Sequence, residues 1–136
     1  MQSMGSRSAT ELLQLPVRLH GIRLGRPVDV LLDVAEWRAL GFVVLCGDES
    51  LRFLVFAAAD LQEDAIAVPS ALLLLEDVEF YRDRSRSLRD VLGGELRDLL
   101  VLPDGYVEAL VVDGKGGVRE VPPTDVPVEA ARVSAG

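Results

Sequence analysis

The stretch VDVLLDVAEWRALGFVV, residues 28–44, sets the expectation for the fold. In its first part, apolar residues alternate with the aspartates Asp29 and Asp33. Residues 40–45 are apolar throughout except for Gly41, as expected of a strand that is covered on both faces. The connection between these two runs is too short for the helical crossover that joins parallel strands. The stretch therefore predicts an antiparallel hairpin.

Further short strands are predicted along the chain, separated by turn residues. The clearest turn is Pro-Asp-Gly at residues 103–105, because proline presets one dihedral angle and glycine accepts a positive φ. Short helical turns are predicted at residues 11–15 and 88–92, and residues 71–81 favour a strand or a mixed structure. The other strands are predicted at residues 17–22, 51–56, 66–68, 96–102, 106–112, 118–121 and, as a last edge, 126–133. This spacing predicts an all-β barrel or sandwich.

The two halves of the chain share one pattern. Residues 28–69 and residues 95–123 both run as strand, turn, apolar strand, glycine-containing turn, strand and proline. The pattern predicts two tandem antiparallel β units with short helical turns. A valine-rich β-meander without any duplication is the alternative. The predicted division is a flexible N-terminal tail over residues 1–15, a first unit over 16–83 and a second, shorter unit over 84–136.

Composition narrows the class of protein. The chain has 136 residues, of which 49% are hydrophobic, so it has enough apolar surface for a folded core. Its net charge of −8 disfavours binding to duplex nucleic acid and to anionic lipid. The single cysteine, Cys46, permits no internal disulfide. No apolar run reaches the roughly 18 residues of a membrane helix, and the first residues lack the apolar stretch of a secretory signal. We therefore expect a cytoplasmic protein without a membrane span.

Several loose motifs point to one family. They are Gly25-x-Pro27-Val28-Asp29-Val30, then Asp33, Trp37-Arg38-x-Leu40-Gly41, Arg52-Phe53 and the proline-ended strand at residues 66–69 with the leucine run after it. With these motifs, residues 19–81 resemble a PRC-barrel domain, the β-barrel of the photosynthetic reaction-centre H subunit and of RimM-type ribosome maturation factors. Residues 87–128 resemble a shorter copy. The resemblance implies small β-barrels with an assembly or scaffolding role.

No catalytic, cofactor-binding or metal-binding residue is predicted. His20 is the only histidine, which excludes a catalytic triad or a multi-histidine metal site within one chain. Cys46 is interpreted as a small core residue. The acidic clusters at residues 48–49, 60–64 and 76–79 lack the spacing of a calcium loop. We therefore expect no cofactor and no enzymatic activity.

Two groups of residues are candidates for binding a partner. Arg82, Arg84, Arg86 and Arg89 concentrate positive charge in an acidic chain, either as a docking segment or as a solubilising linker. Trp37 and Arg38 are residue types that dominate protein interfaces, although a tryptophan here also suits a core.

The leading hypothesis is a non-enzymatic protein-interaction or scaffold module that self-associates as a dimer. The first alternative is an assembly factor for ribosomes or RNA of the RimM type, with the arginine segment touching the particle. The second alternative is a small-ligand binder that uses the barrel interior, although small barrels are normally filled with side chains.

Overall fold

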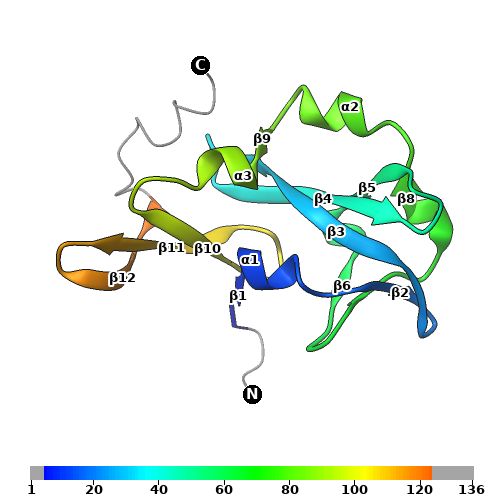
Figure 1. The fold of residues 1–136 in the computed structure, drawn as a ribbon, viewed down its shortest axis with the longest axis horizontal. Coiled ribbons are helices and arrows are strands. Elements are labelled where there is room, and N and C mark those ends of the chain that lie inside the picture. Colours follow the sequence, from blue (N-terminus) through cyan, green and yellow to red (C-terminus); the bar gives the residue numbers. More distant parts are fainter. Residues whose placement is uncertain (1–4, 124–136) are drawn as a thin grey trace.

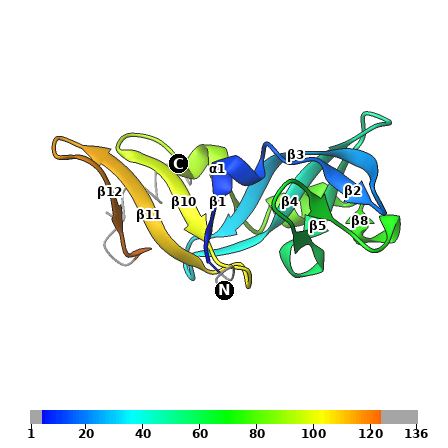
Figure 2. The ribbon, with the colours of Figure 1, turned by 90° about the horizontal axis from the view of Figure 1, so that it is seen from below.

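The computed structural model describes residues 5–123 and shows an all-β fold, as predicted. The strands form two sheets that lie side by side, with short helical turns at their edges (Figure 1). A view turned by 90° shows the same two-part arrangement, with the β10–β12 sheet at one end and the β2–β8 sheet at the other (Figure 2).

The larger sheet has the strand order β6-β7-β2-β3-β4-β5-β8, and β9 pairs separately with β3. Its strands are β2 Val17–Leu19, β3 Ile22–Asp33, β4 Arg38–Cys46, β5 Leu51–Val55, β6 Asp60–Leu61, β7 Ile66–Ala67, β8 Leu74–Leu75 and β9 Arg86–Ser87. The smaller sheet has the order β1-β10-β11-β12, from β1 Arg7–Ser8, β10 Leu96–Val101, β11 Val107–Gly114 and β12 Gly117–Val121. The helical elements are α1 Ala9–Leu12, η1 Phe56–Ala58, η2 Ala71–Leu73, α2 Val78–Arg82 and α3 Leu88–Val91.

The hairpin predicted from residues 28–44 is confirmed as the centre of the larger sheet. β3 and β4 pair antiparallel, and the side chain of Asp33 accepts hydrogen bonds from the backbone N–H groups of Ala35 (3.0 Å) and Glu36 (3.2 Å). An aspartate that satisfies the next backbone donors in this way stabilises a turn, which explains why the chain reverses here. Residues 71–81 have the mixed structure that the sequence favoured.

The central strands of the larger sheet have a hydrophobic core on each face. The main core runs from Ala9 to Leu110 and draws on both sheets, so the two halves of the chain share it. A second, smaller core on the opposite face joins Leu31, Val43, Phe53 and Val78. There the ring of Tyr81 stacks on Phe53, with the ring centroids 4.1 Å apart. Burial on two sides accounts for the unbroken apolar run in β4.

The sequence pattern predicted a flexible tail over residues 1–15, but the described part of this segment is folded. Arg7–Ser8 form β1 and Ala9–Leu12 form α1, with Ala9 and Leu12 fully buried. The hydroxyl of Ser8 caps the helix by accepting from the N–H of Glu11 (3.2 Å). A four-residue helix is too short to give a hydrophobic period, so the serine-rich sequence resembled a tail.

The arginine-containing segment at residues 82–89 is also more ordered than the predicted linker. It includes the end of α2, the strand β9 and the start of α3, and Leu88 is buried in the main core. The predicted edge strand at residues 126–133 lies outside the described residues. Within residues 5–123, β6 and β8 are the two ends of the larger sheet and do not pair with each other, so barrel closure stays a prediction.

The two long hairpins share one pairing pattern. β3 residues 27, 29, 30, 31 and 32 pair with β4 residues 44, 43, 42, 41 and 39. β10 residues 96, 98, 99, 100 and 101 pair with β11 residues 112, 111, 110, 109 and 107, so both register shifts fall at matching places. This common register supports the predicted duplication of one β unit.

Each hairpin is completed by a segment from the other half of the chain. Ser87 of β9 pairs with Leu31 of β3, and Ser8 of β1 pairs with Leu100 of β10. In both cases the serine hydroxyl donates to an aspartate two positions earlier on the paired strand, Ser87 to Asp29 and Ser8 to Asp98. β9 therefore reaches across the predicted boundary between units 16–83 and 84–136, and β1, from the predicted tail 1–15, completes the second unit.

Candidate functional site

The turn ends of the two hairpins meet in the middle of the molecule. The N–H of Val107 donates to the carbonyl of Trp37 (2.8 Å), and the N–H of Ala39 donates to the carbonyl of Gly105 (2.7 Å). Arg38 and Tyr106 lie opposite each other as an isolated β-bridge between these two bonds. Because Trp37 matches Gly105 and Ala39 matches Val107 in the common register, the contact has the reciprocal form of a two-fold interface.

Unusual backbone conformations shape this contact. Trp37 has a φ of 53° and Gly105 a φ of 96°, both in the left-handed region. A side chain on Gly105 would place its Cβ 2.9 Å from the carbonyl oxygen of Ala39, so only glycine lets the hairpin ends approach this closely. A positive φ at a bulky residue is uncommon, and such positions gather at functional sites.

At this contact the side chains of Arg38 and Tyr106 pack together, and Trp37 precedes Arg38 in the chain. The guanidinium carbon of Arg38 lies 5.7 Å from the centroid of the Tyr106 ring, which is the geometry of a cation–π interaction. Tyr106 is 43% exposed, whereas Trp37 is half-buried against the main core. We call Trp37, Arg38 and Tyr106 the junction patch.

Of these three residues, the sequence singled out Trp37 and Arg38 but missed Tyr106. Tyr106 follows the Pro-Asp-Gly turn at residues 103–105, at the place that matches Arg38 in the first hairpin. Aligning the two predicted hairpins on their turns would have pointed to it. The pairing of the two turns could not be read from either hairpin alone.

The four arginines predicted as a docking segment are divided between different environments. Arg82 forms an ion pair with Glu79 (3.0 Å). Arg84 stacks on the Phe80 ring, 3.8 Å from its centroid, and donates to the Phe80 carbonyl (2.9 Å). Both side chains are therefore held by residues of α2, Arg82 from its last position and Arg84 from the turn after it.

The other two arginines of the segment lie further along the chain. Arg86 is half-buried in β9, where it pairs with Leu32, and Arg89 is exposed on α3. The structure thus places Arg82, Arg86 and Arg89 on three successive elements and Arg84 in the turn between the first two, and not on one free linker.

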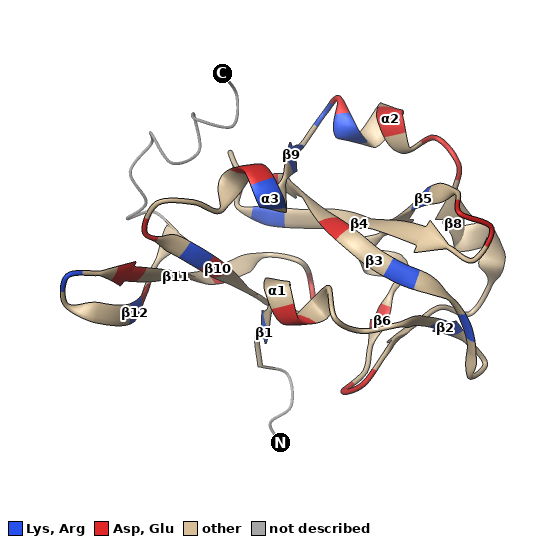
Figure 3. Cartoon of the chain, viewed as in Figure 1, with Lys and Arg blue, Asp and Glu red and all other residues tan. Residues whose placement is uncertain are grey.

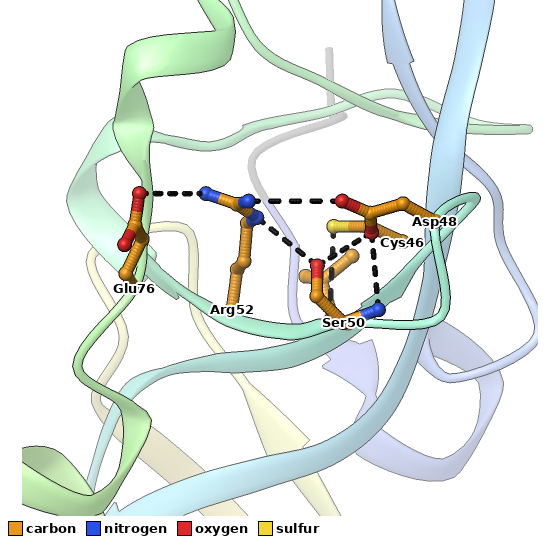
Figure 4. A network of polar contacts seen from close by, with 6 residues as sticks. Cys46, Asp48, Ser50, Arg52 and Glu76 are labelled. Carbon is orange, nitrogen blue, oxygen red and sulfur yellow. Dashed lines mark hydrogen bonds and ion pairs between the residues drawn. The ribbon is translucent and has the colours of Figure 1, made fainter.

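A polar network surrounds Cys46 at the turn between β4 and β5 (Figure 4). The guanidinium of Arg52 contacts the carboxylates of Asp48 (3.8 Å) and Glu76 (3.5 Å), and its Nε donates to the hydroxyl of Ser50 (3.2 Å). Ser50 in turn donates to Asp48 through its hydroxyl (2.5 Å) and its backbone N–H (3.0 Å).

The network perturbs two pKa values in opposite directions. Burial raises the pKa of the Cys46 thiol above 9.0, and this outweighs the lowering effect of the nearby Arg52. Hydrogen bonds from Ser50 lower the pKa of Asp48 below 3.8. A thiol that stays protonated at neutral pH is a poor nucleophile, so the network fits a structural role at the turn.

Within residues 5–123 no group of three or more histidine, cysteine, aspartate or glutamate side chains is placed to hold a metal ion. His20 lies instead in the tight turn between β2 and β3, with a φ of 51°. None of the helices in the same residues is both long and apolar enough to cross a membrane.

Comparison with protein families and with curated proteins returned no match for this chain.

Proposed function

We propose that this protein is a non-enzymatic protein-interaction module of the PRC-barrel kind, and that the junction patch contacts its partner. The observation that carries the proposal is the meeting of Trp37, Arg38 and Tyr106 at the reciprocal contact between the two hairpins. Tryptophan, tyrosine and arginine are the residue types enriched among interface hot spots. Their backbone is fixed by the two hydrogen bonds between the hairpins, so a partner would meet a pre-organised surface.

The chemistry of the described residues supports binding over catalysis. The raised pKa of Cys46 keeps its thiol protonated. The exposed His20 belongs to a hairpin turn and lacks a neighbouring nucleophile in the sequence. The PRC-barrel assignment rests on the motifs at residues 25–41 and 52–69, and the family role in assembly would suit a scaffold.

We also expect self-association in the cytoplasm. Within residues 5–123 the strand β12 pairs only with β11, and Val118 on it is 69% exposed. An exposed strand edge of this kind is a template for pairing with a second copy. A single thiol such as Cys46 persists in reduced form in that compartment. The alternative of ribosome assembly gains no separate support, because Arg82 and Arg84 already contact residues of α2, Glu79 and Phe80.

Affinity purification with a tagged protein tests the junction patch. Arg38→Ala and Tyr106→Ala each remove a side chain from the patch without emptying the core, and should reduce the recovery of a bound partner roughly tenfold or more. Leu72→Ala is the matched control, since Leu72 is 86% exposed and lies far along the chain in η2. Recovery of the same proteins in equal amounts with all three variants would contradict the proposal.

A further inference from the structure

A second surface, separate from the junction patch, gathers three arginines in one groove. The groove has a volume of about 250 Å³ and lies where α1 leads into β2 and the first half of β3. Figure 3 shows the basic segments on β2 and on the adjoining part of β3. Its lining residues are Leu13, Gln14, Leu15, Pro16, Arg18, Arg23 and Arg26.

The strand register places two of these arginines directly opposite each other. His20 and Gly21 form a two-residue turn, with φ of 51° and 83°, that joins β2 to β3. Residues with positive φ at both positions are typical of the type I′ turn, which fixes the pairing of its strands. As a result Arg18 pairs with Arg23 across the two strands. Like charges in directly opposed positions destabilise a sheet.

No carboxylate of the described residues forms an ion pair with Arg18, Arg23 or Arg26. Arg52, Arg82 and Arg97 each have an acidic partner within 4.0 Å, whereas none of the three groove arginines has one in residues 5–123. The chain has 22 acidic residues and 14 basic ones, so a shortage of acidic residues does not explain why these arginines lack ion pairs.

The architecture does not require the three arginines. In the common register Glu95 takes the place of Arg26, directly before the paired residues of β10. The smaller sheet also forms without any strand equivalent to β2. The second hairpin thus has the same pairing without a basic groove beside it.

We propose that Arg18, Arg23 and Arg26 form a binding site for a phosphate monoester dianion. Guanidinium groups bind phosphate through paired, charge-assisted hydrogen bonds. A phosphate has three terminal oxygens and a double negative charge, so one group can bridge the opposed Arg18 and Arg23 and still accept from Arg26. The half-buried side chains of Leu13 and Leu15 offer an apolar contact for the organic part of the ligand.

Phosphate binding by the full chain tests the site. Inorganic phosphate and phenyl phosphate are titrated at constant ionic strength, with sodium acetate and sodium chloride as controls, and binding is followed by calorimetry. Both phosphates should bind, and Arg23→Gln should weaken their affinity by about tenfold, the effect of losing a hydrogen bond to a charged group. Tighter binding of phenyl phosphate would identify an organic phosphate as the ligand, and equal binding would identify the bare phosphate group.

A stability measurement separates this role from a structural one. Without added anion, Arg23→Gln should leave the unfolding temperature unchanged or raise it, because it removes the repulsion with Arg18. Arg97→Gln is the matched control: it removes an arginine that pairs with Asp113 (3.2 Å) in the smaller sheet, and it should leave phosphate affinity unchanged. The proposal is overturned if neither phosphate binds more strongly than acetate, or if Arg23→Gln and the native chain bind phosphate equally.

Discussion

Cys46 shows how the environment of a single residue decides its chemistry. It is the only cysteine, and it ends β4 beside the charged side chains of Asp48 and Arg52. Burial keeps the pKa of its thiol above 9.0, while Asp48 raises and Arg52 lowers that pKa to smaller extents. At neutral pH the thiol is therefore protonated, and the residue type alone would have suggested more reactivity than the site permits.

Alkylation kinetics test this environment. At pH 8 the folded protein should react with iodoacetamide more slowly than the same chain in denaturant. Asp48→Asn should speed the reaction, because it removes a negative charge that disfavours the thiolate. Arg52→Gln should slow it, because it removes the positive charge that favours the thiolate. Equal rates for the folded and denatured chains would contradict the raised pKa.

The raised pKa of Cys46 also makes the free energy of unfolding depend on pH. The folded pKa is raised, so as pH rises the unfolded chain loses the Cys46 proton first. The contribution of Cys46 to the free energy of unfolding is therefore fully present below pH 9.0. It is lost as the pH rises from 9.0 through the pKa of the thiol in the folded protein. Cys46→Ser should remove this part of the pH dependence.

At the scale of elements, the long hairpins were predictable and the shortest strands were not. β3 with β4, and β10 with β11, have alternating or continuous apolar residues and clear turn signals, so their existence follows from sequence. β1 and β9 have two residues each and are held by serine–aspartate contacts with strands far along the chain. Hydrophobic periodicity contains no information about such contacts.

The residues of the candidate sites differ in the same way: some could be chosen from the sequence, and others only from the pairing of strands and turns. Trp37 and Arg38 could be selected by residue type, since both are common in interfaces. Tyr106 joins them only through the bridge between two hairpin turns. The arginine groove depends on the register of β2 against β3, which contains an irregularity between Val17 and Arg18. The turn at His20 and Gly21 sets the Arg18–Arg23 pair, but the bulge beyond it changes where Arg26 lies relative to that pair, and a sequence pattern does not predict the bulge.

The contribution of α1 to the stability of the fold can be tested at Leu12. Leu12 is 1% exposed and packs in the main core, although it lies in the segment that resembled a tail. Leu12→Ala should lower the free energy of unfolding by about 2–5 kcal/mol, as for other fully buried leucines. Urea denaturation measures the change, and Leu72→Ala, at an exposed leucine, should change it by less than about 0.5 kcal/mol. A negligible effect of Leu12→Ala would show that α1 does not contribute to the fold.

At the scale of the molecule, the two halves are joined in three independent ways. They share the main core, they meet at the Arg38–Tyr106 bridge, and each completes the hairpin of the other. A chain built like this resembles a two-fold dimer of one β unit, with both copies on one polypeptide. Because each half lacks part of its own packing, we expect neither to fold alone.

This organisation predicts one cooperative unfolding transition for the whole protein. Asp98 in β10 accepts hydrogen bonds from Ser8, from the hydroxyl (2.9 Å) and N–H (3.1 Å) of Thr10, and from the N–H of Leu99 (2.7 Å). Asp98→Ala leaves these donors without their acceptor and should cost about 1–3 kcal/mol. Trp37, the only tryptophan, reports on the other hairpin, so its fluorescence should shift to the same lower urea midpoint as far-ultraviolet circular dichroism.

The matched variant in the first half is Asp29→Ala. Asp29 is buried and accepts from the N–H of Val30 (2.8 Å) and from the hydroxyl of Ser87, so the loss should be of similar size. Asp64→Ala, at an exposed aspartate, serves as the control and should leave the midpoint in place. If the halves were independent, Asp98→Ala would move the circular dichroism signal in part and leave the Trp37 transition unchanged. Coincident shifts of both signals in both variants are expected, because a core shared by two hairpins has no boundary along which one half could unfold first.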